Sequence, residues 1–271
     1  MTSGSISNSR DIAPFIQRHQ LVVFILLAYS ISWWPWIWYQ YDPITADAPI
    51  LPMGPFLAAL ILTALCGGWA AVIAWLKNIL NWRVGWQWLL FSLALPVAFT
   101  FGAVGLNFLL GAHSVASFQI PDVGSIAFRF LFIFLWIGLG EEPAWRGYAL
   151  PKFLQSHNAL VAAILLGIVH VIWHAPLYGV EYDSANVLPW GITVICVSIV
   201  ICWMYLNTNG NLLLPMLLHT SNNTIALVWK MFSGNDQLQL WWLWCAVWVF
   251  ATVVLIAWKG FDLKHGELDK F

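Results

Sequence analysis

The chain has 271 residues, of which 61% are hydrophobic and only 8% are charged. A typical soluble domain carries about 25% charged residues, so this composition excludes an ordinary soluble globule. The net charge of −1 gives no electrostatic reason to expect nucleic acid as a partner. We therefore predict an all-α, polytopic membrane protein whose surroundings are the lipid bilayer.

Eight apolar stretches are long enough to cross a bilayer, which takes about 20 residues. They cover residues 21–39, 51–76, 86–110, 125–145, 159–178, 188–206, 212–229 and 240–258. Residues 1–20 and 259–271 are predicted to be tails, and residues 21–258 the membrane domain. No small-residue cleavage site follows the first stretch, so we interpret it as a transmembrane helix rather than a signal peptide.

Lysine and arginine are unevenly distributed between these stretches. Lys230 alone lies in an odd-numbered connection, and nine others lie in the tails and the even-numbered connections. The nine are Arg10, Arg18, Lys77, Arg83, Arg146, Lys152, Lys259, Lys264 and Lys270. This bias predicts a multi-pass protein of the cell membrane with both termini cytoplasmic. Arg129 is the exception, near the outer start of the fourth span, where it is expected to snorkel or pair internally.

Two adjacent carboxylates, Glu141 and Glu142, follow the apolar run of the fourth span. Burying them costs free energy unless a partner lies close. Arg146 lies four residues after Glu142, so on a helix the two share a face and are expected to pair. Glu141 lies about 100° round the helix and is left to point elsewhere. The alternative is a solvated charged patch where the helix leaves the bilayer.

Two other spans carry histidine and asparagine inside apolar sequence, which makes them functional candidates. The fifth span has His170 and His174, and the seventh has His219 and Asn223. The members of each pair are four residues apart and lie along one helix face. A lone histidine in such a position is more often a packed residue that bonds to a neighbouring helix. Three histidines, an asparagine and two glutamates on three spans favour a shared site.

Residue counting places two of these side chains at one depth. If the fourth and fifth spans form a hairpin that turns near His157, Glu141 lies 16 residues before the turn and His174 lies 17 after it. Equal rise per residue brings both to the same level, about 25 Å from the turn. We therefore expect Glu141 and His174 to be neighbours.

These residues resemble the motifs of the CPBP intramembrane proteases, a family that includes the Rce1-like CAAX-prenyl endopeptidases and bacterial Abi-type proteins. The family pattern EExxxR matches residues 141–146, FxxxH matches 170–174 and HxxxN matches 219–223. The resemblance covers residues 125–229 and agrees with eight spans around a site inside the helix bundle. His170 departs from it, because the family usually has phenylalanine there. We interpret His170 as filling an aromatic-sized space and bonding to a neighbouring helix, in preference to a direct catalytic role.

The resemblance implies an endopeptidase that acts on a membrane-associated or lipidated protein or peptide. Glu141 is expected to activate a water molecule as general base together with His174. His219 and Asn223 are expected to stabilise the oxyanion. Each such donor typically lowers the activation barrier by about 3 kcal/mol. The supporting residues are expected to be Glu142, Arg146 and His170.

The cofactor is either none or a zinc ion. Glu141, His174 and His219 form a two-histidine, one-carboxylate set, which is a zinc peptidase arrangement. The chain has no H-E-x-x-H motif. We favour slightly a mechanism that depends on the glutamate without metal.

Two other functional classes compete with the protease. A proton-coupled transporter would also hold Glu and His in mid-membrane, but we detect no inverted repeat with broken helices. A non-catalytic membrane scaffold of the same fold, or a bacteriocin self-immunity protein, would act by binding partners. Retention of Glu141, His174, His219 and Asn223 together favours the enzyme.

Overall fold

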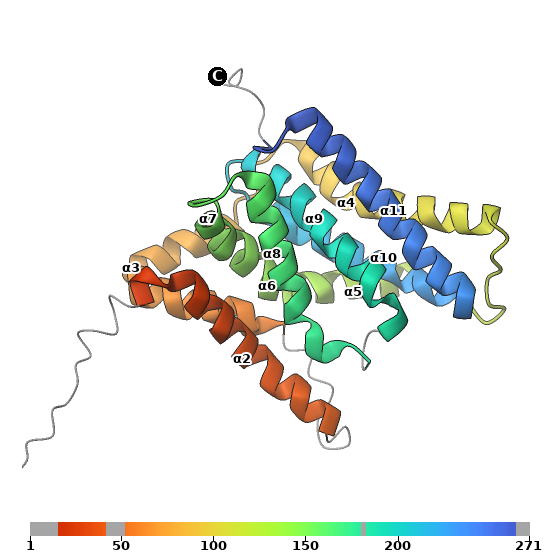
Figure 1. Cartoon of the computed structure of the whole chain (residues 1–271), viewed down its shortest axis with the longest axis horizontal. Helices are drawn as coiled ribbons and strands as arrows, with labels where there is room; N and C mark the ends of the chain where they lie inside the picture. The colour runs from red at the N-terminus through yellow and green to blue at the C-terminus, as the bar shows by residue number, and fades with distance from the viewer. Residues whose placement is uncertain (1–15, 42–51, 180–182, 264–271) are drawn as a thin grey trace, which may run out of the picture.

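The computed structural model describes residues 16–41, 52–179 and 183–263. Its elements are all helical, which confirms the predicted all-α class (Figure 1). The longer α-helices are α2 (Gln20–Tyr41), α3 (Met53–Ile79), α4 (Trp86–Leu109), α8 (Ala159–Trp173), α9 (Val187–Leu206), α10 (Leu213–Ile225) and α11 (Gly234–Lys259). Short 3₁₀ helices are η3 (Ala175–Leu177), η4 (Ser184–Asn186) and η5 (Ala226–Met231).

The fourth predicted span is one helical run with changing geometry. Its parts are α5 (Val123–Ile133), the π-helix η1 (Phe134–Gly138), α6 (Leu139–Ala144), the π-helix η2 (Trp145–Ala149) and α7 (Leu150–Phe153). The side chain of Asp122 caps its start by accepting a hydrogen bond from the Ser125 N–H at 3.0 Å. π-Helices are rare and often mark functional sites. Here they flank the short helix that carries both glutamates.

Within the described residues, six helical runs are long and apolar enough to cross a membrane. The chain is therefore a multi-pass membrane protein, but this measure does not reach the predicted count of eight. The fifth and seventh candidates are shorter than expected, with 15 residues in α8 and 13 in α10. Pro176 follows soon after the end of α8, and α10 continues as the 3₁₀ helix η5, so neither segment forms a full-length α-helix.

Hydrogen bonds between connections define one end of the bundle. The Asn211 side chain donates to the Asn81 carbonyl at 2.6 Å, which joins the connection before α10 to the one after α3. The Leu160 N–H donates to the Phe261 carbonyl at 2.9 Å, which joins the start of α8 to the segment after α11. Lys152, at the end of α7, precedes the same turn, and we call this the Lys152 end.

The opposite end is held together in the same way. The Val115 N–H donates to the Met231 carbonyl at 2.8 Å, and the His113 N–H donates to the Asp236 carboxylate at 3.0 Å. These bonds join the connection after α4 to η5 and to the start of α11. We call this the Lys230 end. The helical segments that meet at the two ends therefore run alternately in opposite directions.

Glycines allow the closest helix approaches around the centre. A Cβ on Gly167 of α8 would come within 2.9 Å of the Ile195 Cα of α9. A Cβ on Gly140 of α6 would come within 2.8 Å of the Pro52 carbonyl oxygen, just before α3. The backbone before α3 thus lies directly against the helix that carries the glutamates.

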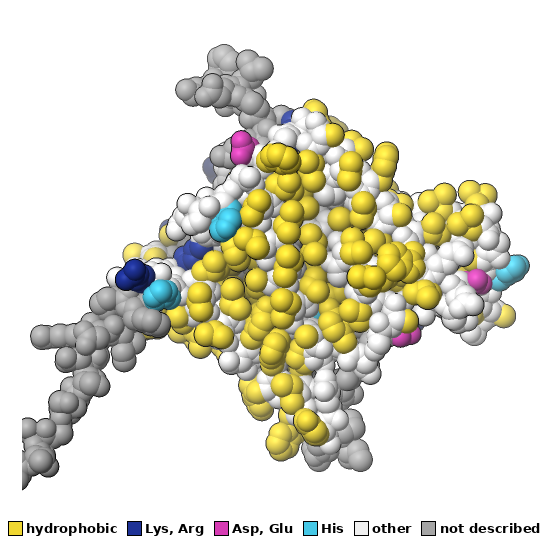
Figure 2. Space-filling model, in the orientation of Figure 1, with side chains coloured by type: hydrophobic (Ala, Val, Ile, Leu, Met, Phe, Trp, Pro, Cys, Tyr) yellow, Lys and Arg dark blue, Asp and Glu magenta, His cyan; other side chains and the backbone are white. Residues whose placement is uncertain are grey.

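The outer surface is apolar, as expected for contact with lipid. Figure 2 shows one face covered mainly by hydrophobic side chains, with charged side chains at its edges. Large exposed side chains include Phe128 and Leu131 on α5 and Phe250 on α11. A soluble monomer rarely exposes apolar surface on this scale. The bilayer is the medium that makes it stable.

Candidate active site

The two glutamates of α6 are both buried, with exposed fractions of 3% for Glu141 and 0% for Glu142. Nη1 of Arg146, one turn further along, lies 2.9 Å from Oε1 of Glu142. The ion pair expected from their spacing is therefore present. It lies inside the bundle and not on a solvated patch, because Arg146 is also buried. A buried carboxylate needs a partner of this kind to offset its desolvation.

His219 of α10 binds the same carboxylate. Its Nδ1 lies 2.7 Å from Oε1 of Glu142, so this oxygen accepts from both Arg146 and His219. Glu142 thereby connects α6 and α10. Since Nδ1 donates to Glu142, Nε2 is the ring nitrogen of His219 that remains for a further hydrogen bond.

His170 of α8 contacts the other glutamate. Its Nε2 lies 2.9 Å from Oε2 of Glu141. Its ring also packs against two buried indoles, with centroids 5.3 Å from Trp145 and 5.8 Å from Trp173. The aromatic surroundings agree with a ring that fills space. The contact with Glu141 gives His170 a polar function that packing does not require.

His174 lies at the carboxyl end of α8, next to His170. Its Nδ1 donates to the His170 carbonyl oxygen at 3.0 Å. Its ring lies 5.0 Å from the His170 ring and 5.0 Å from the ring of Trp190 of α9. Because a carbonyl only accepts, the neutral His174 ring is the tautomer whose Nε2 is a hydrogen-bond acceptor.

Glu141, His170 and His174 form a compact group, each offering one metal-ligand atom within 4.8 Å of the others. The sequence analysis named Glu141, His174 and His219 as the metal set. The structure places His170 beside Glu141 and His174, while Nδ1 of His219 lies 2.7 Å from Oε1 of Glu142. The predicted set with His219 stays a prediction.

This group fits three ligands of a zinc ion, which binds imidazole nitrogen and carboxylate oxygen. The bond from His174 to the His170 carbonyl matches the second hydrogen bond that metal-binding histidines usually make. In contrast, Nδ1 of His170 is buried and has no hydrogen-bond partner in the described part of the chain. The donor set therefore fits zinc, while the support around His170 is incomplete.

The residue count predicted that Glu141 and His174 are neighbours, and this is confirmed, because their ligand atoms lie within 4.8 Å of each other. Two features shorten the chain between Glu141 and the turn. The π-helix η2 closes its hydrogen bonds over five residues and thus uses more residues per turn than an α-helix. Residues 154–158 then lie between α7 and α8 and add no regular helical rise. The rise per residue is therefore not uniform between Glu141 and the turn, although the residue count predicted the correct neighbours.

Asn223 lies one helical turn after His219 on α10 and is half-buried. Its carbonyl oxygen accepts a hydrogen bond from Nη2 of Arg129 at 3.0 Å. Its side-chain oxygen accepts from Nδ2 of Asn222 at 3.5 Å. Of the two alternatives for Arg129, the structure therefore shows internal pairing, which ties the middle of α5 to α10.

The sequence analysis missed the aromatic enclosure of the histidines. Trp145, Trp173 and Trp190 surround the rings of His170 and His174. The signal available was their position, since Trp145 lies inside the EExxxR motif and Trp173 directly precedes His174. Their indoles exclude water from the group, which strengthens its electrostatic interactions.

Two comparisons with known proteins bear on the site. Residues 123–225 match the model of a family described as Rce1-like, type II CAAX prenyl endopeptidase Rce1-like, and this range contains all three motifs. CAAX prenyl protease 2 from Methanococcus maripaludis is 27% identical over 184 residues. The match covers 62% of this chain and 66% of that relative, slightly less than two thirds of its length. The resemblance predicted from the motifs is confirmed.

Proposed function

We propose that this chain hydrolyses a peptide bond of a membrane-associated or lipidated protein or peptide, because residues 123–225 match the model of the Rce1-like CAAX prenyl endopeptidases. The observation that carries the proposal is the contact of 2.9 Å between Glu141 and His170, with His174 beside it. Carboxylate and imidazole groups are the usual general bases of hydrolysis. Here they meet inside an apolar bundle.

Glu141 is the general base in this mechanism. It takes a proton from a water molecule, whose oxygen attacks the scissile carbonyl carbon. The same carboxyl group then gives the proton to the departing amine as the C–N bond breaks. His174 orients the water through Nε2, the acceptor of its neutral ring. His170 holds the Glu141 carboxylate in place through Nε2.

His219 and Asn223 supply hydrogen bonds to the developing oxyanion. Since Nδ1 of His219 donates to Glu142, its Nε2 donates as well only when the ring carries both protons. The Glu142 carboxylate stabilises that charged ring, and Arg146 balances the carboxylate in turn. Preorganised donors of this kind typically contribute about 3 kcal/mol each to lowering the barrier.

Where a zinc ion takes part, Glu141, His170 and His174 are the residues that hold it. A bound zinc supplies Lewis acid polarisation and lowers the pKa of a coordinated water. The roles of Glu142, Arg146 and His219 are the same in either case, because they lie on the other carboxylate.

The proposed topology has eight membrane-crossing segments, with the domain at residues 21–258 and tails at residues 1–20 and 259–271. The Lys152 end and both termini face the cytoplasm, in the cell membrane. Support comes from the nine-to-one Lys and Arg bias. The alternation of the connections between the two ends supports the same arrangement. The two short segments, α8 and α10, cross the apolar interior packed against their neighbours.

The test uses the purified full-length chain in lipid nanodiscs and a membrane-anchored peptide library read by mass spectrometry. We expect the wild type to cleave at a defined bond and Glu141→Gln to lose activity by about 10²-fold or more while keeping its thermal midpoint. Equal cleavage by both proteins would exclude Glu141 as the base. If the folded wild type cleaves no anchored peptide and instead retains an intact protein partner, the scaffold alternative replaces the enzyme.

A further inference from the structure

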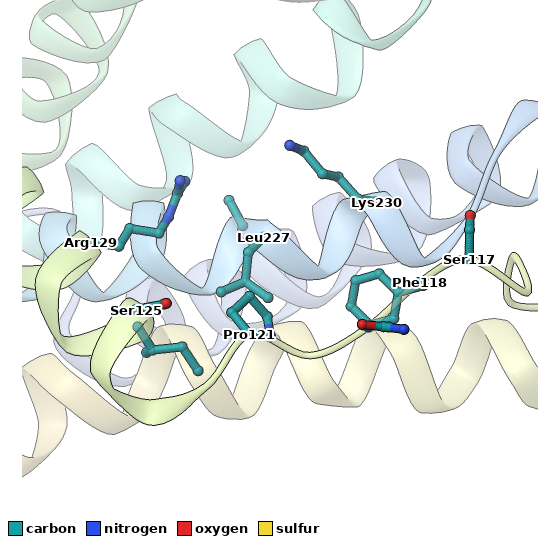
Figure 3. Close-up of a pocket in the computed structure, with 10 residues that line it drawn as sticks. Ser117, Phe118, Pro121, Ser125, Arg129, Leu227 and Lys230 are labelled. Carbon is teal, nitrogen blue, oxygen red and sulfur yellow. The ribbon is translucent and has the colours of Figure 1, made fainter.

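A cavity lies away from the glutamates, at the Lys230 end of the bundle. Its volume is about 590 Å³, and it opens between the start of α5, the connection after α4 and the helix η5 (Figure 3). The bond between Val115 and Met231 fixes one side of it, and the Asp122 cap fixes the start of α5 on the other. The cavity is thus framed by one backbone hydrogen bond and one helix cap.

Two cationic side chains line this cavity, Arg129 of α5 and Lys230 of η5. Figure 3 shows both rising on the same side of it. Both are exposed, and within the described ranges neither lies within 4 Å of a carboxylate. They are the same two residues that depart from the Lys and Arg bias of the whole chain. Both exceptions therefore meet in one cavity at the end that otherwise lacks positive charge.

The acidic group nearest in sequence is Asp122, which does not line the cavity. Its carboxylate accepts hydrogen bonds from the N–H and the hydroxyl of Ser125. These bonds lower the pKa of Asp122, so the group is ionised at neutral pH. It is fully exposed, and water and salt screen its repulsion of an anion. The cavity lining itself contains no Asp or Glu.

The rest of the lining is partly apolar. Phe118, Ile126 and Leu227 are half-buried and contribute their side chains to the cavity. The neighbouring outer surface of α5 is apolar too, because Phe128 is 71% exposed. An occupant that satisfies this surface has an anionic group beside an apolar chain. A free inorganic ion meets only the first requirement.

We propose that this cavity binds the phosphate group of an anionic phospholipid, with its acyl chains along the apolar face of α5. Arg and Lys near a membrane surface attract anionic headgroups in this way. The guanidinium of Arg129 has five N–H donors, and its bond to the Asn223 carbonyl uses one of them. Arg129 therefore reaches the lipid phosphate and α10 at once, so the lipid steadies the helix that carries His219.

The experiment measures binding of phosphatidylglycerol to the delipidated full-length protein by native mass spectrometry, with phosphatidylcholine as the neutral comparison. We expect the wild type to prefer phosphatidylglycerol. Arg129→Ala and Lys230→Ala should each weaken the binding of phosphatidylglycerol about fivefold, and the double variant should weaken it about 25-fold. Lys77→Ala removes an exposed cation at the opposite end and should leave the affinity for phosphatidylglycerol unchanged. Glu141→Gln should bind lipid as the wild type does, which separates this site from the proposed protease activity.

Three results would overturn the proposal. Equal affinity for both lipids, or equal weakening by Lys77→Ala, means that no specific site exists. Inorganic phosphate that binds as tightly as the lipid and displaces it identifies a free anion as the ligand. If lipid binding is unchanged in the double variant while the KM for an anchored peptide rises, the cations recognise a carboxylate of the substrate.

Discussion

Nε2 of His170 lies 2.9 Å from Oε2 of Glu141, between α8 and α6. Both side chains are buried, so water does not compete for this hydrogen bond. The ring of His170 is held by the indole of Trp145, and Gly140 lets the backbone before α3 lie against α6. The position of the Glu141 carboxylate therefore depends on the imidazole of His170.

From this contact we expect His170→Phe to lower kcat by about 10- to 100-fold with little change in KM. Phenylalanine preserves the ring that packs on Trp145 but removes the atom that holds Glu141, and small displacements of a catalytic group cost rates of this size. Kinetics on an anchored peptide would measure the effect. His170→Gln should recover part of kcat, because its amide can donate to Glu141. A folded His170→Phe protein with wild-type kcat would show that His170 only fills space.

We expect Arg146→Ala to destabilise the protein by about 3 kcal/mol, because it leaves the buried Glu142 carboxylate with His219 alone. The midpoint of thermal unfolding in nanodiscs would measure it. Arg83→Ala, which removes an exposed arginine, is the control and should stay within about 0.5 kcal/mol.

A second variant separates charge from packing at the same place. The double change Glu142→Gln with Arg146→Met removes both charges and leaves an unbranched side chain that fills part of the space of Arg146, so it should be more stable than Arg146→Ala. If the two proteins unfold at the same temperature, Arg146 acts through its packing, and the ion pair contributes nothing measurable.

The positions of most helices could be predicted from the sequence. The predicted span at residues 86–110 is α4 (Trp86–Leu109), and the span at residues 188–206 is α9 (Val187–Leu206). The bilayer demands a long apolar run with every backbone hydrogen bond made inside the segment. The pairing of Glu142 with Arg146 followed from helix geometry alone.

The partners of Glu141 and His219 could not be predicted, because they depend on how separate helices meet. The sequence around η2 does not distinguish a π-helix from an α-helix, so the local rise per residue could not be predicted. Whether His219 binds Glu141 or Glu142 depends on the approach of α10 to α6. The sequence shows two adjacent carboxylates and does not indicate which of them α10 approaches.

We expect the activity to withstand metal chelators. The separation of Glu141 and His170 is that of a direct hydrogen bond, and Nδ1 of His170 lacks the second partner that usually orients a metal-binding histidine. The measurement is peptide cleavage before and after dialysis against EDTA and 1,10-phenanthroline, with metal content by mass spectrometry. Activity that disappears on dialysis and returns with zinc would contradict this. His170→Ala should then also lower the zinc content.

The last prediction concerns the orientation of the two ends. Two exposed serines report on them, Ser156 between α7 and α8 and Ser114 after α4. Each is replaced by cysteine in a chain whose native cysteines are changed to serine or alanine. The native cysteines are Cys66, Cys196, Cys202 and Cys245.

In intact bacterial cells, a membrane-impermeant maleimide should label Ser114→Cys and leave Ser156→Cys unlabelled. The reason is that lysine and arginine gather at the Lys152 end, which the positive-inside bias assigns to the cytoplasm. A permeant maleimide should label both variants, which shows that each cysteine is accessible in the folded protein. Labelling of Ser156→Cys from outside would invert the topology. The cavity of Arg129 and Lys230 would then face the cytoplasmic leaflet, where anionic lipid is also abundant, so the lipid site itself would survive this result.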